Sequence, residues 1–364
     1  MSDLTLRRAV VTGRLDADGA STGRVRLLGG PLAGGEFGAV LYPQFSAGGF
    51  GEDPGIAVGQ EVLVNTLGVE MGLGTGGVVF VVPEADAEVG PIPNNDHFVK
   101  LPYTPLQFPA QLPKGVHGTS NASARGDLPE ADLPLRGVPV VVLGLHSHLA
   151  VACSAAASRR RRVSFVWQEG GALGVGFSGS VRELRSSGLL GPVVSVGACF
   201  GGDLEAPNIY SGLEVAASAG DIVLVGIGPG IVGTNSRYGH GGMSAAGALN
   251  AACALGARPV LAPRLSAAEP RERHRGISHH TLTALEATLA GCRVAVPESG
   301  CELPADFRGS GRHEFVPSKG SAAGLEGRFG LTFRSMGRGY MEDPVFFDAA
   351  AAAVEVALSE EVGA

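Results

Sequence analysis

Hydrophobic and polar positions alternate in short runs over the first part of the chain. Between Leu6 and Val82 glycine-containing turns separate five such runs, RRAVVTGRL, GRVRLL, FGAVLYP, QEVLVNT and GGVVFVV. A period of two is typical of strands with one buried face, and closely spaced strands without intervening helices form barrels or sandwiches. We therefore expect a small antiparallel β-barrel or β-sandwich domain over residues 1–105.

The following stretch, residues 106–137, is rich in proline and polar residues. Proline has no backbone N–H group and cannot continue a hydrogen-bonded ladder. We expect this stretch to be a linker, or a strap that lies on the surface.

After Gly137 continuous apolar runs replace the alternation. There are six of them: PVVVLGL, RVSFVW, PVVSVGACF, DIVLVGIG, RPVLAP and CRVAVP. Continuous runs indicate strands buried on both faces, as in a parallel sheet with helical crossovers. The expected helices lie near residues 148–158, 178–190, 205–219, 242–256 and 278–291. Residues 138–364 are thus predicted to form a doubly wound, mostly parallel α/β sheet of Rossmann-like type.

Two more elements are expected near the end of the chain. The run GLTFRS at residues 330–335 has the composition of a strand. Asp343 and Pro344 suit the N-cap and the first turn of a closing helix.

Composition excludes several classes of function. The net charge is −7 and only three of the 364 residues are lysine, so we expect no nucleic-acid partner. No apolar run approaches the roughly 20 residues that cross a bilayer, and we expect a cytoplasmic protein without a membrane partner. Five cysteines without a C-x-x-C pair argue against a disulfide framework and a zinc ribbon.

Polar residues follow five of the predicted parallel strands. The carboxyl ends of such strands meet at one edge of the sheet, where ligands bind. The residues at these ends are His146 and His148, Gln168 and Glu169, Asp203 and Glu205, Asn235, Arg237 and His240, and Arg264 with the loop 271–280.

The first and third of these groups each have two interpretations. His146 and His148 could ligate a metal, or Ser147 could cap a helix while the imidazoles form ordinary hydrogen bonds. Asp203 and Glu205 could bind a divalent cation or act as acid and base, or they could be an N-cap and a first-turn anion.

The segment GIGPGIVGTNSRYGHGG, residues 226–242, is dense in glycine and follows a predicted strand. Bare backbone N–H groups in such a loop can approach an anion closely, although the spacing matches neither a P-loop nor G-x-G-x-x-G. The predicted ligand-binding residues here are Gly228, Gly230, Gly233, Thr234, Arg237 and His240. Cys199, at another strand end, is either a nucleophile or a buried inert thiol.

The segment RHRGISHH, residues 273–280, concentrates imidazoles and guanidinium groups. Ser278 suits the N-cap of a helix whose first turn contains His279 and His280, and the helix dipole disfavours imidazolium there. Neutral imidazoles can ligate metals or act as bases, and arginine forks bind carboxylate or phosphate. The alternative is a hydrated basic loop. The predicted anion-binding residues are Arg264, Arg271, Arg273 and Arg275.

Several long segments resemble a known family. VLGLHSHLA, VGACFGGDLEAPNIYSGL, GIGPGIVGT, RHRGISHHTLTAL, MGRGYMEDPVFF, GQEVLVNTLGVEMGLGTGGVVFVV and KLPYTPLQ are similar to signature segments of a bacterial family catalogued as a domain of unknown function, number 3866. The resemblance covers nearly the whole chain and implies membership without an activity. Members often read GHAFGGDLEAVN, whereas this chain has Ala198 at the histidine position, which argues against a mechanism that needs an imidazole there.

These patterns lead to one main hypothesis and two alternatives. In the main one, the chain is an enzyme that hydrolyses or transfers a group of a small anionic metabolite, phosphorylated or carboxylated. Its catalytic residues are His146, His148, Asp203, Glu205, His279 and His280, and a divalent metal ion is bound by His146, His148, Asp203 and His279. The alternatives are a regulatory module that binds a metabolite or nucleotide, and an assembly protein whose sheet edge joins copies in a homo-oligomer.

Overall fold

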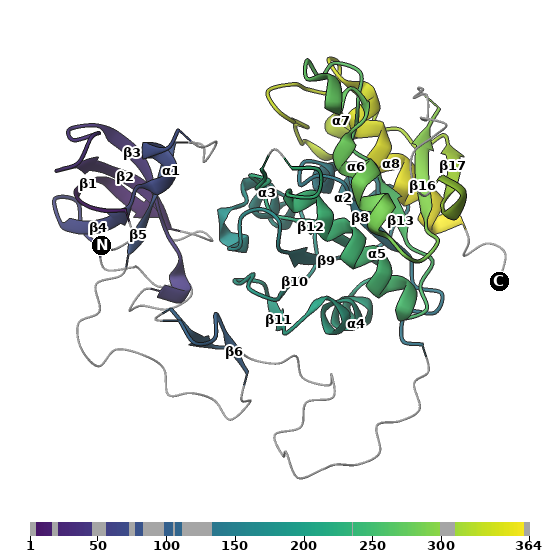
Figure 1. The fold of residues 1–364 in the computed structure, drawn as a ribbon, viewed down its shortest axis with the longest axis horizontal. Coiled ribbons are helices and arrows are strands. Elements are labelled where there is room, and N and C mark those ends of the chain that lie inside the picture. The colour runs from purple at the N-terminus through teal and green to yellow at the C-terminus, as the bar shows by residue number, and fades with distance from the viewer. Residues whose placement is uncertain are drawn as a thin grey trace, which may run out of the picture. The chain divides into compact units, whose positions relative to one another are not determined.

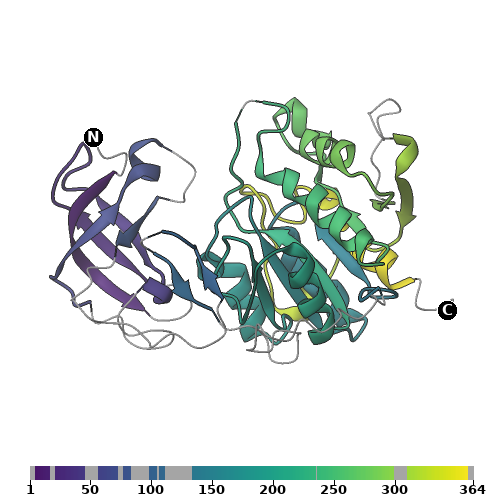
Figure 2. The same ribbon diagram turned by 60° about the horizontal axis from the view of Figure 1, so that its bottom comes forward.

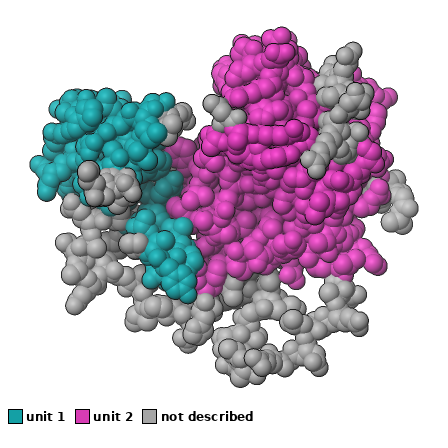
Figure 3. Space-filling view, in the orientation of Figure 1, with its two compact units in different colours: residues 1–95, 101–109 teal, residues 96–100, 110–364 magenta. Residues whose placement is uncertain are grey.

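The structure is a computed structural model that describes residues 5–16, 21–45, 56–72, 77–82, 98–104, 106–110, 133–234, 236–298 and 310–359. The chain divides into two compact units, coloured separately in Figure 3: residues 1–95 with 101–109, and residues 96–100 with 110–364. Residues 111–132, most of the predicted linker, lie outside the described residues.

The N-terminal unit contains a closed five-stranded barrel (Figure 1). Its strands run in the order β1-β2-β3-β5-β4. Their bounds are β1 Leu6–Asp16, β2 Ser21–Leu27, β3 Glu36–Leu41, β4 Glu61–Asn65 and β5 Val78–Val82. Alternate side chains such as those of Val11, Val25 and Val64 fill the interior. The prediction of a barrel is confirmed, and one pair, β3 with β5, is parallel rather than antiparallel.

Four short elements also lie in the first 110 residues. A 3₁₀ turn, η1, spans Pro43–Phe45 and a helical turn, α1, spans Leu67–Glu70. The short strands β6 (Val99–Lys100) and β7 (Phe108–Pro109) follow.

The C-terminal unit contains an eight-stranded sheet in which every pair is parallel. The strand order is β11-β10-β9-β12-β8-β13-β16-β17. The strands are β8 Val140–Leu143, β9 Val163–Gln168, β10 Val193–Val196, β11 Leu204–Ala206, β12 Ile222–Ile227, β13 Val260–Ala262, β16 Arg293–Pro297 and β17 Glu314–Ser318. The predicted parallel α/β fold is thus confirmed.

Helices cover both faces of this sheet (Figures 1 and 2). One apolar core contains residues of α2 (His148–Ser158), α3 (Gly179–Ser186), α7 (Leu325–Phe329) and α8 (Pro344–Leu358). The other contains residues of α4 (Ile209–Ala219), α5 (Ser244–Ala254) and α6 (His279–Ala287). Along β8 the side chains alternate between the two cores, because successive residues of a strand point to opposite faces.

The loops at the sheet edges contain short elements. They are η2 Val175–Phe177, η3 Gly241–Met243, β14 Leu265–Ser266, η4 Glu272–His274, β15 Gly276–Ile277 and η5 Ser310–Arg312. β14 and β15 pair with each other in a small antiparallel ladder. No helix in the described parts of the chain has both the length and the apolar character that a membrane crossing needs.

Three local predictions need correction. The run GLTFRS forms no strand: the side chains of Leu331 and Phe333 are buried in the core, but the segment belongs to no sheet of the described residues, and the last described strand is β17. The helix expected over 205–219 begins at Ile209, with Asn208 as its N-cap, because β11 precedes it. Asp343 does not cap α8 through its side chain, although Pro344 opens the helix as predicted.

Candidate functional site

A hairpin after β12 brings His240 to the start of α6. Gly241 donates a backbone hydrogen bond to Val232 over 2.8 Å, and Gly233 pairs with His240 as an antiparallel bridge. At the tip, Arg237 Nη2 lies 2.6 Å from Glu286 Oε1 of α6. The ladder and the ion pair together hold the hairpin against α6.

The glycines of this segment have packing roles. A Cβ atom at Gly228 would lie 2.3 Å from the carbonyl oxygen of Ala172, so a larger residue would separate the two loops. Gly230 has a φ of 73°. Gly233 lies in the hairpin ladder, and the Thr234 hydroxyl bonds within the hairpin tip. The predicted binding of an anion by these residues stays a prediction.

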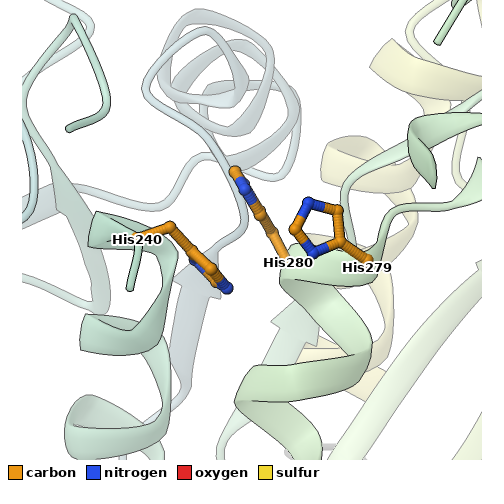
Figure 4. Close-up of side chains that lie close together, drawn as sticks. All are labelled: His240, His279 and His280. Carbon is orange, nitrogen blue, oxygen red and sulfur yellow. The ribbon is translucent and has the colours of Figure 1, made fainter. Parts of the chain in front are cut away.

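Three imidazoles meet where the hairpin faces α6 (Figure 4). His240, His279 and His280 each offer a nitrogen, and these nitrogens lie within 4.8 Å of one another. The ring centroids of His240 and His280 are 3.9 Å apart, and those of His279 and His280 are 4.4 Å apart. Ser278 caps α6 as predicted, accepting from His280 N over 3.2 Å, and this places His279 and His280 in the first turn.

The hydrogen bonds around His240 determine which of its nitrogens is available. Thr283 Oγ1 donates to the carbonyl of His279 over 2.8 Å, so the same oxygen accepts from His240 Nε2–H at 2.9 Å. The lone pair then resides on His240 Nδ1, which is buried and makes no hydrogen bond of normal geometry within the described residues, although the backbone carbonyl of Arg237 acts on this ring and raises its pKa against the larger effect of burial. A Cβ atom at Gly242 would lie 3.0 Å from this Nδ1, so glycine keeps the space beside it open.

The other two imidazoles differ in their partners. His279 Nε2 is also buried and lacks a hydrogen-bond partner within the described chain. The Nδ1 atom of His280 accepts from Arg264 Nη1 at 3.3 Å, a long bond. The cluster therefore presents two unengaged imidazole nitrogens and a third that is weakly engaged.

A fourth imidazole, that of His274, lies beside the cluster. Its ring centroid is 4.8 Å from those of His279 and His280, and its Nδ1 lies 2.6 Å from Ser278 Oγ. The hydroxyl of Ser278 thus connects the helix cap to the histidine cluster.

Burial is the main cause that lowers the pKa of every imidazole in this cluster. The pKa of His274 falls to about 3 and that of His280 to about 2. Those of His240 and His279 are also lowered, and the charge of Arg264 contributes to all four shifts. All four rings are neutral near pH 7, which is the form that ligates metals.

Several arginine side chains lie beside the histidine cluster. Arg264 is 3% exposed, and burial lowers its pKa to about 10, with Arg271 as the next cause. Glu269 accepts from Arg271 at 2.6 Å and from Arg338 at 3.2 Å, and the bonds from Arg271 are the main reason that its pKa falls to about 2. Arg275 Nε donates to the Glu269 carbonyl at 3.3 Å.

Positive charge therefore exceeds negative charge beside the imidazoles. The charge of Arg273 lowers the pKa values of Arg264, His274 and His279, so this arginine adds to the same field. Three guanidinium groups, those of Arg264, Arg271 and Arg338, share the carboxylate of Glu269. The guanidinium of Arg338 also pairs with Asp343 over 3.5 Å. The surroundings of Arg264 thus suit an anion.

His146 is engaged away from the cluster. Its Nδ1–H donates to Ile227 O at 3.0 Å, and its Nε2 accepts from Ser178 Oγ at 2.8 Å. Burial lowers its pKa to about 4. Of the two interpretations of His146, metal ligand or hydrogen-bonded imidazole, these contacts fit the second.

His148 is fully buried at the start of α2. Its ring packs on Phe346 with centroids 4.5 Å apart, and burial lowers its pKa to about 3. Within the described residues, the only group of three or more potential ligands that comes together is His240, His279 and His280. The predicted metal set of His146, His148, Asp203 and His279 is therefore not assembled.

Asp203 and Glu205 lie elsewhere than predicted. Asp203 accepts from the backbone N–H of Val193 at 2.8 Å and pairs with Arg185, so it lies at the amino end of β10. Glu205 is part of β11, and its carboxylate lies 3.0 Å from Lys100 Nζ. Burial raises the pKa of Glu205, against the effect of Lys100. Neither is the helix-terminal residue expected from the sequence.

Lys100 is a buried charged residue that the sequence patterns did not single out. It is 1% exposed, and besides Glu205 its ammonium contacts the carbonyl oxygens of Ser195 at 3.1 Å, Gly197 at 3.0 Å, Cys199 at 2.8 Å and Ala206 at 3.2 Å. The signal available was the rarity of lysine in this chain. Cys199 beside it is buried, and burial raises its pKa to about 12, which favours the interpretation as a buried thiol over that as a nucleophile.

No curated protein and no solved structure matches this chain. A family model does match it over residues 52–354, a range that includes the histidine cluster, the arginines around it and the buried Lys100. The chain thus belongs to the family described as protein of unknown function (DUF3866).

Proposed function

We propose that the chain is an enzyme that binds a divalent metal ion through His240, His279 and His280 and hydrolyses, or transfers a group of, a small anionic metabolite. One observation carries the proposal: His240 and His279 each have a buried ring nitrogen without a partner among the described residues, and both belong to a group of three histidines that each offer a nitrogen within 4.8 Å of the others. Buried polar atoms are normally hydrogen-bonded, so their absence of partners supports a missing ligand.

The donor set fits zinc-like ions. Three imidazoles with an open fourth position are a known arrangement for catalytic zinc, which supplies Lewis acidity and lowers the pKa of bound water. Zinc–nitrogen bonds of about 2.0–2.1 Å place ligand atoms about 3.4 Å apart. The present separations of up to 4.8 Å require the rings to turn inward on binding.

The arginines explain why the substrate would be anionic. A divalent cation beside the buried Arg264 is repelled unless an anion neutralises both. The weak bond from Arg264 to His280 Nδ1 would be released when the guanidinium turns to such an anion. Anion and metal would then each favour the binding of the other.

Metal analysis and paired variants test this proposal. The purified full chain is loaded with Zn²⁺, Co²⁺ or Mn²⁺, and we expect one ion per chain, with Co²⁺ absorption reporting nitrogen ligands. His279→Ala and His240→Ala should lose the ion, and Gly242→Ala should weaken it by crowding His240 Nδ1. His313→Asn is the matched control, since both nitrogens of His313 are already bonded, to Cys292 Sγ and Leu285 O.

Activity is then measured against panels of phosphoesters and carboxylic esters. Turnover that requires His240 and His279 supports the enzyme. A ligand-induced rise in melting temperature without product would instead support the regulatory module. A chain that binds none of the three ions at saturating concentration would contradict the metal site.

A further inference from the structure

The turn Ser335–Arg338 holds a methionine in an unfavourable conformation. Ser335 and Arg338 exchange two backbone hydrogen bonds of 2.9 Å each. Between them Met336 has a φ of 50° and Gly337 a φ of 80°. Two positive φ values in succession are those of a type I′ turn, whose first central position favours Asn or Gly. A methionine there carries a steric cost that the surroundings must maintain.

The side chain of Met336 reaches two guanidinium groups of the candidate site. Its Sδ lies 3.4 Å from Arg264 Nη2 and 3.6 Å from Arg271 Nη2. A thioether is a weak, neutral acceptor. The other hydrogen bond of the Arg264 guanidinium goes to His280 Nδ1, and the oxygen in its ion pair, Glu269 Oε2, is 3.7 Å away. A buried guanidinium therefore contacts a sulfur atom where a charged oxygen would bind far better.

Both ends of the turn are anchored. Arg338 donates to Glu269 at 3.2 Å, and the hydroxyl of Ser335 lies 2.9 Å from that of Ser147. The fixed frame presents Met336 at the tip, so this side chain can move while the turn remains in place.

We propose that Met336 is a displaceable plug that occupies the phosphoryl subsite of this protein. Two guanidinium groups converge on one point beside a surplus of positive charge, and this arrangement fits the oxygens of a phosphate dianion better than a single carboxylate. When a phosphoryl group binds Arg264 and Arg271, the Met336 sulfur leaves. The inference rests on the proposed function, because the same arginines would hold the substrate. It adds that the anionic group of this substrate is a phosphoryl group.

Nuclear magnetic resonance on the full chain observes the displacement directly. The chain has five methionines, so methyl-¹³C labelling gives a sparse spectrum, in which Met336→Leu identifies the Met336 signal. Inorganic phosphate is added to protein treated with a chelator. We expect a saturable shift of the Met336 methyl signal and none of that of Met341, which is 86% exposed. Acetate at equal concentration should shift it far less.

Variants measure the competition. Met336→Gly removes the plug and suits the turn, and it should tighten phosphate binding about tenfold if Met336 occupies the subsite nine-tenths of the time. Met341→Gly, in the same loop, should change nothing. Arg271→Gln should weaken binding about tenfold or more, since it removes a charge-assisted donor.

Unchanged or weaker phosphate affinity in Met336→Gly would overturn the inference. If that variant does not fold, the phosphate titration of the wild-type protein tests the inference instead. A Met336 methyl signal that does not shift with phosphate would also overturn it. Because these measurements use metal-free protein, they are independent of metal content. The protein could bind no metal and still show a phosphate affinity that changes with substitution of Met336. That result would support the plug and contradict the metal site.

Discussion

Two buried charged clusters in the C-terminal unit differ in how fully their charges are satisfied. The ammonium of Lys100 contacts four carbonyl oxygens and the carboxylate of Glu205, all at 2.8–3.2 Å. That carboxylate also accepts from Ser195 Oγ at 2.6 Å and from Gly201 N at 2.8 Å. Arg264, almost as deeply buried, has a sulfur atom, an imidazole and a more distant carboxylate.

The contrast separates a structural ion pair from a candidate binding site. Burial of a charge is costly unless oppositely charged and polar partners replace water. The Lys100 cluster meets that condition within the chain itself. Around Arg264, buried nitrogens of His240 and His279 lack partners among the described residues, which supports the proposed ligand site.

The largest effect is expected from breaking the satisfied cluster. Lys100→Met leaves Glu205 and four carbonyl groups without their shared donor, and it should lower the free energy of unfolding by about 3–5 kcal/mol. Urea denaturation followed by the fluorescence of Trp167, the chain's one tryptophan, measures this. The exposed Lys319 provides the control Lys319→Met, expected to be neutral. A loss below about 1 kcal/mol in Lys100→Met would show that the cluster contributes little.

Two histidine variants sharpen the comparison. His146→Ala leaves Ile227 O and Ser178 Oγ without their hydrogen-bond partner and creates a cavity. It should lower the free energy of unfolding by about 3 kcal/mol. His279→Ala removes a ring whose Nε2 has no partner among the described residues, and its cost should stay within about 1 kcal/mol. Both are read from the same urea curves. Equal losses in the two variants would remove the distinction between bonded and unbonded imidazoles.

Acid should act on His146 in a defined pH range. Its folded-state pKa of about 4 lies below the ordinary value of 6.5, so the unfolded chain takes up the proton first as the pH falls. The contribution of neutral His146 to the free energy of unfolding is complete above pH 6.5 and is lost as the pH falls towards 4. At pH 5 the loss is about 2 kcal/mol. Unfolding of the wild type and of His146→Gln is compared between pH 7 and pH 5. Parallel curves for the two proteins would exclude this histidine as the cause.

The fold was predictable where hydrophobic pattern alone determines structure. PVVVLGL reads as a strand buried on both faces, and β8 is such a strand. Pattern was insufficient where an element is very short or unpaired. β11 has only three residues, too few to show a periodicity. Phe333 is buried in a segment that belongs to no described strand or helix, so burial there follows no secondary-structure period.

The candidate site was predictable only in part, for a related reason. His279 and His280 are adjacent in sequence and follow a cap, and this local signal led to both of them. Their contact with His240 depends on a hairpin held by Arg237 and Glu286 across the loop. Lys100 and Met336 contact groups that are far away in the sequence, and nothing in their own neighbourhoods indicates those contacts.

The smallest effect is expected at Asp203, where sequence and structure disagree about location. Its side chain is 44% exposed, and the partners of its carboxylate are Arg185 and the backbone N–H of Val193. Solvent screens such a pair, and asparagine keeps an acceptor for the N–H group, so Asp203→Asn should change the free energy of unfolding by less than about 1 kcal/mol. Metal content and phosphate affinity should equal those of the wild type. Loss of the metal ion in this variant would mean that the amino end of β10 takes part in the site, and the comparison between a closed structural cluster and an open binding cluster would no longer hold.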